Sequence, residues 1–425
     1  MVRAALPITA LFLSLVLLTS GNTMLGTLLA VRLELEGFRA ALSGLILAFY
    51  AIGFVLGTMY GIRIIQRVGH IRAFAVFGAV TSAVILVHPM FVSTDLWLVL
   101  RLIIGFCIAG LMLITESWVN TIATAQTRGT LLAIYLLLFY LAAASGQFLI
   151  AAGDPATHLL FSVAAILVSL SLIPVLLTRT VAPEIHESER LGVRELYETA
   201  PLGIIGGFVS GATMSAFNTM GPIYATRVGL EITQLSLFMG IGVLSAMLFQ
   251  WPVGFISDRF MRSRVVFALA LAGIGAALLA TVAGRTSNVA LFLTGGIYVG
   301  IVASLYPVCL ALTHDQMPHN KIVPANATLL LCFGLGTIAG PIGSAVLMTV
   351  TGPEGLFVFA AIALVALAAR AAYYLRHQPQ VPVTEQEHCV AVAPVSTPVL
   401  MELDPRSTTY GETPAGADEQ RAAAG

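Results

Sequence analysis

The residues best able to do chemistry in this sequence form one short charged segment between two long apolar stretches. It runs from Gly254 to Arg264 and contains one acid, Asp258, beside the arginines Arg259 and Arg262. The chain around it is 58% hydrophobic and only 10% charged. Charges at this density are solvated only where lipid meets water. This segment, called the second clasp, is therefore expected at a membrane surface.

A weaker copy of this segment, called the first clasp, occurs earlier in the chain. It runs from Ile62 to Arg72, with Arg67 at the position of Arg259 and Arg72 at that of Arg264, while a glutamine replaces the acid. The following pairs recur at nearly the same spacing: Asn22 with Asn218, Gly105 with Gly300, and Gly146 with Gly340. The chain therefore reads as two similar halves.

Composition fixes the class of protein. Average chains carry about 25% charged residues, so a 425-residue chain with 10% charged residues is not a soluble globule. Apolar runs of about 20 residues, long enough to cross about 30 Å of hydrocarbon as helices, recur along the chain. The expected spans are 7–30, 41–62, 73–92, 97–119, 130–152, 157–178, 201–223, 235–256, 265–284, 288–312, 325–349 and 355–375. We expect an all-α membrane protein with twelve transmembrane helices.

The positions of arginine and lysine in the short loops predict the orientation. Nine of them lie on the side of the N-terminus and four on the other, which places both termini in the cytoplasm of a bacterial inner membrane. The expected domains are a six-helix bundle over 1–178, a cytoplasmic linker over 179–200 and a second bundle over 201–376. The tail over 377–425 has no periodicity that could bury a face, so disorder is expected there.

Missing motifs exclude several kinds of function. The sequence has no phosphate-binding glycine loop, no metal-ligand cluster and no nucleophile motif, and its four cysteines show no C-x-x-C spacing. A net charge of zero gives no sign of nucleic-acid binding. An enzyme, a cofactor and ATP-driven transport are therefore not expected. The expected partners are the lipid bilayer, a small solute and coupling protons, and the expected state is a monomer.

Arg101 is the sharpest candidate for contact with a solute or for proton transfer. It lies about one turn inside the fourth expected span. An arginine at the centre of a membrane helix costs from about 2.5–3.5 to about 10–17 kcal/mol, depending on the measure, so it must face the interior, water or a partner. Gly296 occupies the equivalent place in the second half, so the fold of a half does not require the charge. The alternative role is an anchor that reaches the interface or bonds helix carbonyls.

Glu116 lies further along the same span, about 22 Å from Arg101 along a helix. The two side chains therefore cannot pair, and Glu116 belongs near the cytoplasmic face. A structural salt bridge with Arg67 or Arg72 is expected there, with proton carriage as the alternative.

Asp258 is expected to hold the two halves together on the cytoplasmic side. A helix N-terminus favours a nearby anion by about 0.3–1 kcal/mol when exposed and up to about 2 kcal/mol when partly buried. The start of the fifth span, near Gly129, is such a terminus. The alternative is an interfacial charge that only fixes topology. Asp315 is expected to pair with Arg259 or Arg262. The remaining expected gating residues are Gly254, Arg67, Arg72 and Glu116.

Neutral side chains inside the spans complete the candidate solute contacts. Asn22 and Asn218 lie near the middle of the first span of each half, and a buried amide needs hydrogen-bond partners. Such amides either bond across helices, worth about 0.6 kcal/mol on average, or face the solute. Tyr140 is assigned to packing or lipid contact. The weaker candidates for solute contact are Gln147, Tyr298 and Tyr306.

These residues resemble the major facilitator superfamily. Gly254-x-x-x-Asp258-Arg259-x-x-Arg262 resembles its loop signature, and Arg101-x-x-x-Gly105-x-x-x-x-Gly110 resembles its span-four motif. The resemblance covers residues 1 to about 376. Leu305-Tyr306-Pro307 and Gly336-x-x-x-Gly340-Pro341 extend it to the bacterial YcaD-type group, whose substrates are unassigned. It implies two facing six-helix bundles and a solute site between them near the bilayer midplane, reached from alternate sides as the halves rock.

The predicted function is a secondary transporter that moves a small solute by alternating access. The lone interior cation favours a small organic anion. Proton-coupled efflux of drugs or metabolites is one alternative, although span five reads Ala142 to Gln147 where the family's proton-coupled drug antiporters typically show a Gly-Pro signature. A non-transporting sensor or scaffold that retains the fold is the other alternative, which the neutral Gln66 of the first clasp and the long tail permit.

Overall fold

The computed structural model describes residues 2–124, 126–177, 191–318 and 321–386, together with Cys389, Thr397, Val399 and Leu400. These residues form helices and no strand. Eleven helices are long and apolar enough to cross a membrane, and the bent pair α7–α8 makes a twelfth span. The helices of the first half are α1 (Val2–Leu35), α2 (Ala40–Val68), α3 (His70–Val87), α4 (Thr94–Ile122), α5 (Arg128–Leu149) and α6 (Leu159–Leu177), with the short 3-10 turn η1 (Ile150–Ala152) after α5.

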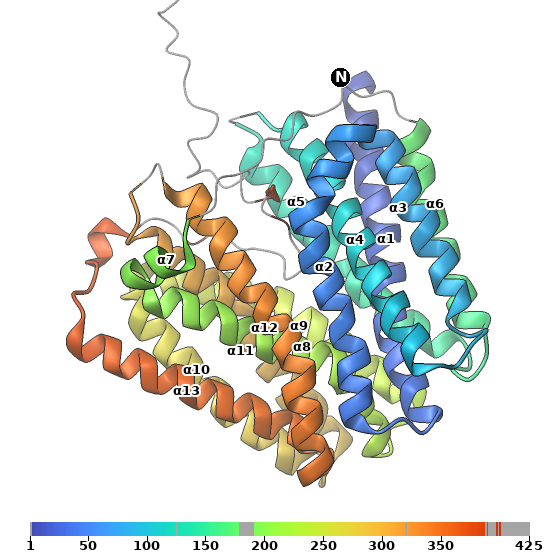
Figure 1. Ribbon diagram of the computed structural model, residues 1–425. Helices are drawn as coiled ribbons and strands as arrows, with labels where there is room; N and C mark the ends of the chain where they lie inside the picture. Colours follow the sequence, from blue (N-terminus) through green and yellow to red (C-terminus); the bar gives the residue numbers. More distant parts are fainter. Residues whose placement is uncertain are drawn as a thin grey trace, which may run out of the picture.

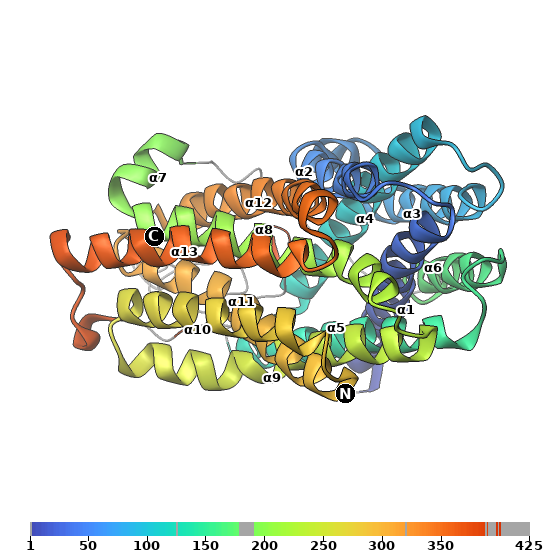
Figure 2. The same cartoon turned by 90° about the horizontal axis from the view of Figure 1, so that it is seen from below.

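The second half repeats the pattern after a short connecting helix, α7 (Val193–Thr199). Its long helices are α8 (Pro201–Arg227), α9 (Ile232–Arg259), α10 (Arg262–Ala283), α11 (Asn288–His314), α12 (Ile322–Thr351) and α13 (Gly355–His377). The predicted fold of twelve transmembrane helices in two pseudo-repeats is confirmed. The halves stand side by side in Figure 1 and meet along α2 with α12 and α5 with α9, as the view from below shows (Figure 2).

Close glycine contacts set the helix pairs inside each half. A Cβ on Gly105 of α4 would lie 2.0 Å from the carbonyl oxygen of Tyr50 on α2, and the equivalent Gly300 of α11 packs on the Phe249 ring of α9. Gly146 of α5 lies against the α1 backbone, and its equivalent on α12, Gly340, lies against the α8 backbone. Glycines that were paired by sequence spacing thus serve equivalent helix pairs, which is the structural sign of the repeat.

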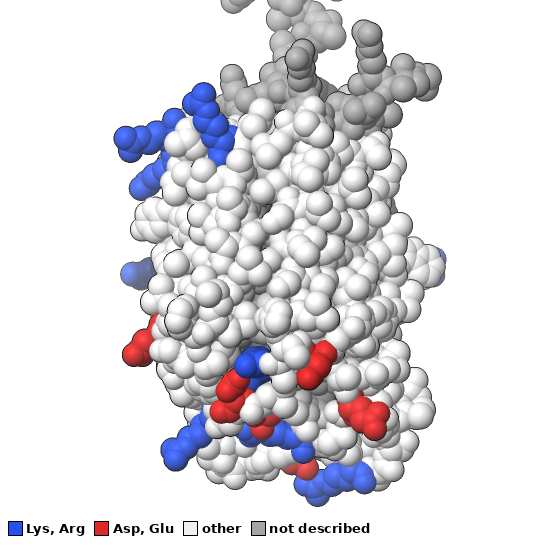
Figure 3. Space-filling model, turned by 90° about the vertical axis from the view of Figure 1, so that its right-hand side faces the viewer, with Lys and Arg blue, Asp and Glu red and all other residues white. Residues whose placement is uncertain are grey.

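The two ends of the bundle carry different charges. The end where α1 begins is called the N-terminal face, and the other end the opposite face. On the side of the molecule shown in Figure 3, the upper end carries only basic residues, and the lower end carries both signs. Exposed Arg63, Arg67 and Arg72 lie at the N-terminal face, where α2 gives way to α3. Gly69 turns the chain between these two helices with a φ of 88°, a conformation that glycine adopts without strain.

Part of the tail contacts the helices, which differs from the expected disorder. The turn η3 (Val383–Glu385) follows α13, and beyond it Thr397, Val399 and Leu400 are buried. Thr397 hydrogen-bonds to Glu116 of the first half, whereas Cys389 hydrogen-bonds to Asp258 of the second. These are single contacts without helical or strand periodicity, so no sequence pattern predicts them. The rest of the tail from residue 387 lies outside the described residues.

Candidate solute-binding site

A cavity of about 230 Å³ lies between the two halves. Small-molecule sites of about 300–1,000 Å³ bury most of a drug-sized ligand, so this cavity suits a smaller solute. Helices α1, α2, α4 and α5 line it on one side and α8, α9 and α12 on the other. The middle of α2 (residues 50–59) and the first half of α12 (residues 327–337) both line it. The cavity therefore lies near the middle of the bundle, and along α12 it extends toward the N-terminal face.

Four of the six side chains expected to contact the solute line this cavity: Arg101, Asn22, Asn218 and Gln147. The other two do not. Tyr298 is buried inside the second half, where its hydroxyl donates a hydrogen bond to the carbonyl of Thr213. Tyr306 is buried with its ring against Phe333, 4.6 Å between centroids. The expectation for these tyrosines is wrong because a large ring at a helix interface packs as readily as it faces a solute.

Arg101 is the only charged side chain among the described residues that line the cavity. Only 3% of its surface is exposed, and no described residue forms an ion pair or hydrogen bond with its guanidinium. Its partner is the ring of Tyr50, 4.5 Å from the guanidinium carbon to the ring centroid. Burial of a cation without an anion is costly, so the site holds unsatisfied positive charge.

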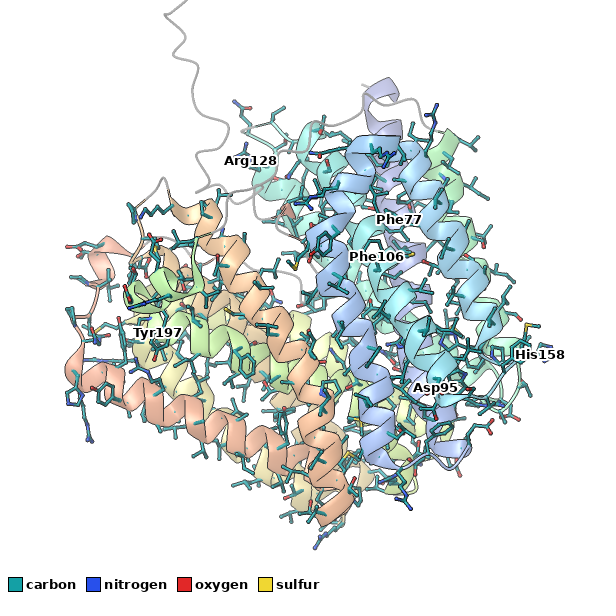
Figure 4. The ribbon with its side chains drawn as sticks, in the orientation of Figure 1. Phe77, Asp95, Phe106, Arg128, His158 and Tyr197 are labelled. Carbon is teal, nitrogen blue, oxygen red and sulfur yellow. The ribbon has the colours of Figure 1, made fainter. Side chains whose placement is uncertain are left out.

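Helix packing places Arg101 over that ring. Gly105 follows Arg101 by one turn and rests on the backbone of Tyr50, which holds α4 close to α2. On its other side α4 packs on α3 through Phe106 and Phe77, labelled in Figure 4, whose rings meet edge to face at 6.2 Å. Gly110 makes room for the Phe77 ring. The arginine and the two glycines of the span-four motif therefore act together, because the glycines fix the helix that carries the charge.

Tyr50 joins three helices of the first half at the cavity wall. Its hydroxyl accepts a hydrogen bond of 3.0 Å from the Asn22 amide on α1, while its ring faces Arg101 on α4. Tyr50 was not predicted from the sequence as a cavity residue. The available signal was a tyrosine inside the second apolar span.

Further polar groups connect the halves across the cavity. Gln147 accepts a hydrogen bond of 2.7 Å from Thr27, and its backbone carbonyl accepts one of 2.7 Å from Ser236 on α9 of the second half. Tyr140, which the sequence assigned to packing or lipid contact, lines the cavity and bonds to Gln250 of α9. Asn218 is exposed, and its amide has no hydrogen-bond partner among the described residues. Amide and hydroxyl groups thus line the same cavity as the single cation.

The opposite face is closed by contacts between the halves. Arg227 at the end of α8 forms a two-pronged ion pair with Glu34 at the end of α1, with N–O distances of 2.9 and 3.0 Å. Below the cavity, Gly44 of α2 packs directly on Pro341 and Ala345 of α12. Neither member of this ion pair was singled out from the sequence.

At the N-terminal face, the expected gating pairs are only partly formed. Arg262 is buried and pairs with Asp315, as one of the two expected pairings proposed. It also lies 3.5 Å from Asp258. The carboxylate of Asp258 accepts a 2.7 Å hydrogen bond from the backbone N–H of Cys389, not from the start of α5. In Figure 1, α2 and α12 separate toward this face.

Glu116 differs most from its expected role. It is fully buried and accepts hydrogen bonds from the Tyr135 hydroxyl at 2.9 Å and from Thr397 of the tail. The expected partners Arg67 and Arg72 are both exposed, and neither forms an ion pair with the buried Glu116. The salt bridge expected from sequence is therefore wrong in this conformation.

Gly254 and Arg259, the remaining expected gating residues of the second clasp, make few contacts in this conformation. Gly254 would meet open space if it carried a Cβ. Arg259 is exposed and lies over the Phe255 ring of its own helix at 4.0 Å. Neither contact involves the first half of the protein.

Comparison with known proteins places this architecture in a family. The sequence profile of the Major Facilitator Superfamily matches residues 11–281 and 203–401. The uncharacterized MFS-type transporter YcaD of Shigella flexneri is 28% identical over 364 residues, which cover 84% of this chain and 92% of the relative. The uncharacterized MFS-type transporter Ent638_1421 of Enterobacter sp. (strain 638) is 27% identical over 361 residues, covering 84% and 92%.

Solved structures show the same fold. The nucleoside transporter NupG superposes with a TM-score of 0.71 at 17% identity, covering 89% of this chain and all of that one. The D-xylose-proton symporter superposes with a TM-score of 0.64 at 16% identity, covering 89% and 98%. The profile match, the relatives and the two six-helix halves around a central cavity agree: the chain belongs to the major facilitator superfamily, a family of multi-pass membrane transporters and not of enzymes.

Proposed function

We propose that this transporter carries a small organic anion across the cytoplasmic membrane by alternating access, and that Arg101 binds the negative group of the solute. One observation carries the proposal: a buried arginine without a counter-ion lines the central cavity. No acid lies among the described residues of the cavity lining. A negatively charged solute would supply the counter-ion that Arg101 lacks among the described lining residues.

The magnitudes favour an anion over a neutral solute. The contact of Arg101 with the Tyr50 ring contributes about 0.5–2 kcal/mol. Burying an ion without a counter-ion costs several kcal/mol, so the ring offsets only part of the cost. A carboxylate or phosphate can bond a guanidinium in two places and offsets the remainder.

The neutral part of the solute has polar and aromatic neighbours. The amides of Asn22, Gln147 and Asn218 offer donors and acceptors around the cation, and Phe54 and Phe139 supply apolar wall. The superposed nucleoside transporter and D-xylose-proton symporter carry solutes that are rich in hydroxyl groups. The amides would suit hydroxyl groups here as well, so a hydroxylated or aromatic acid fits the cavity better than a bare inorganic ion.

The conformation is assigned to the inward-facing state of the cycle. The excess of positive charge in the loops of the N-terminal face supports a cytoplasmic location for that face. The cavity extends toward that face, while the Glu34–Arg227 pair closes the other. With no acid among the described lining residues, the solute's own carboxylate is the group suited to carry a coupling proton.

A thermal-shift screen of the purified protein tests the anion. The panel holds pairs matched in shape, such as a sugar acid with its parent sugar and an aromatic acid with its amide. A ligand at a hundred times its dissociation constant stabilises the native state by about 2.7 kcal/mol. We expect stabilisation by acids and not by their neutral partners, with the effect lost in Arg101→Gln and weakened in Arg101→Lys, which keeps the charge without the planar fork.

Two results would contradict the proposal. Equal stabilisation by an acid and its neutral partner would show that the site does not recognise charge. An acid that stabilises Arg101→Gln as strongly as the unchanged protein would place the charge recognition elsewhere. Uptake of the labelled acid into proteoliposomes then separates transport from mere binding.

A further inference from the structure

The C-terminal tail joins the two halves at the N-terminal face. It leaves α13 in the second half, and Cys389 is still held there, because its backbone N–H donates to Asp258 of α9. By Thr397 the chain has reached the first half, where the backbone N–H donates to Glu116 of α4 at 2.9 Å. In Figure 1 the dark red end of the described chain lies beside α5, far from α13.

The tail contacts are buried and specific. Thr397 donates to the Glu116 carboxyl from its hydroxyl as well as from its backbone. The carbonyl of Val399 accepts a hydrogen bond from the Asn120 amide, one turn further along α4. Val399 and Leu400 belong to the same buried apolar cluster as Trp118 and Leu131. Hydrogen bonds to Glu116 and Asn120 thus attach this end of the tail to the first half.

The acids that hold the tail come from both halves and lie at the same face. Glu116 is near the end of α4 and Asp258 near the end of α9, and both helices end at the N-terminal face. Neither carboxylate forms the contact expected of it from sequence, since Glu116 does not pair with Arg67 or Arg72 and Asp258 does not cap α5. The tail uses both instead.

We propose that Glu116 and Asn120 of α4, together with Asp258 of α9, form a docking site for the chain's own tail, and that the docked tail inhibits transport by keeping the N-terminal face open. Closing that face brings α9 toward α5, and the tail lies on the carboxylates of both halves. The tail must therefore leave before the halves can close. Release of the tail becomes a step at which transport is regulated.

Cys389 is a natural reporter of docking. The chain has four cysteines, and the other three, Cys107, Cys309 and Cys332, are buried in helices. We expect a water-soluble maleimide to label Cys389 slowly in the full-length protein. Thr397→Pro removes both the backbone N–H and the hydroxyl that donate to Glu116. It should speed labelling by about tenfold or more, since a lost hydrogen bond to a charged group changes an equilibrium by roughly that factor.

The matched control is Thr397→Ser, which keeps both donors and should label at the rate of the unchanged protein. Cys389→Ser gives the background from the buried cysteines. Equal rates in Thr397→Pro and Thr397→Ser would overturn the docking site, because the contact with Glu116 would then not hold the tail.

A reporter on the opposite face tests the inhibition. Ser236 is buried between the halves there and donates to the Gln147 carbonyl, so Ser236→Cys is shielded until that face opens. In a Cys389→Ser background, a chain ending at Gln386 should label Ser236→Cys several-fold faster than the full chain. Unchanged labelling would show that the tail docks without controlling the halves, and would overturn the inhibitory role.

This inference rests on the proposed function only in assuming that the two halves open alternately toward the two faces. Neither labelling experiment needs a solute. Failure of the anion screen together with faster labelling after truncation would reject the anion and keep the tail site. Stabilisation by acids in the screen together with unchanged labelling in the tail variants would reject the tail site alone.

Discussion

At the scale of residues, two buried arginines show how the presence of an anionic partner determines whether a charge is structural or functional. Arg262 is buried and paired with Asp315, and Asp258 lies nearby. Arg101 is buried beside a ring and has no anion among the described residues. A paired arginine holds helices together, whereas an unpaired one costs stability that only a ligand can restore. The comparison separates a structural charge from a functional one.

Removal of these two charges should change stability in opposite directions. Arg101→Met takes away an uncompensated ion and should raise the free energy of unfolding of the ligand-free protein by about 1–3 kcal/mol, as removal of function-related strain often does. Arg262→Met leaves Asp315 without its cation and should lower it by about 3–5 kcal/mol. Denaturant unfolding of each variant in the same detergent measures both. Destabilisation of Arg101→Met to the level of Arg262→Met would make Arg101 an anchor.

At the scale of elements, glycines decide how closely helices approach and therefore where side chains point. Gly53 and Gly57 of α2 press on the α4 backbone from one side, and Gly105 of α4 presses on α2 from the other. This close contact brings the Tyr50 ring under Arg101. The same glycines thus affect both stability and the solute site.

Gly105→Ala should harm both. Its Cβ would lie 2.0 Å from a backbone oxygen, so α2 and α4 must separate, at a cost of about 1–3 kcal/mol in the free energy of unfolding. Affinity for the anion should fall with it, because Arg101 moves away from Tyr50. Gly275→Ala is the control, since nothing lies within 4 Å of that Cβ, and helix propensity should make it neutral or about 0.5–1 kcal/mol more stable. Similar thermal unfolding and binding for the two variants would contradict the role of the contact.

At the scale of the whole molecule, the balance between the two faces sets the conformation. One ion pair, Glu34 with Arg227, joins the halves at the opposite face, and the tail spans them at the N-terminal face. Both features favour the same state, in which the cavity extends toward the N-terminal face. Conformational change requires that these contacts break.

Breaking the ion pair should therefore open the opposite face. Glu34→Gln or Arg227→Met should raise maleimide labelling of Ser236→Cys by about fivefold, the effect of about 1 kcal/mol on a two-state equilibrium. The exchanged pair, Glu34→Arg with Arg227→Glu, should return labelling toward the original rate. Arg285→Met breaks an ion pair with Glu354 that stays within one half at the same face, so it should leave labelling unchanged. An equal rise in that control would attribute the effect to general loosening.

Features of the fold and site that depend on local sequence were predictable, and features that depend on contacts between distant residues were not. Helices and their repeat were predictable because a span needs only a continuous apolar run, and paired glycines such as Gly105 and Gly300 mark equivalent contacts. Arg101 was predictable as a cavity residue because an arginine inside a span has few places to lie. Tyr50 and Tyr140 were missed and Tyr298 and Tyr306 misplaced, since a tyrosine inside a span can line a cavity or pack between helices, and helix packing decides which.

The sequence by itself determined the membrane class, the twelve helices, their twofold repeat and the position of the interior cation, because hydrophobic length and the cost of a buried charge act on each helix alone. Only the tertiary structure decided which groups surround that cation, which ion pair closes the opposite face, and where the tail binds. Those features join residues far apart in the chain, such as Glu34 with Arg227 and Glu116 with Thr397. Which residues meet depends on how the helices pack and how far the two halves have rotated relative to each other. No local stretch of residues specifies either property.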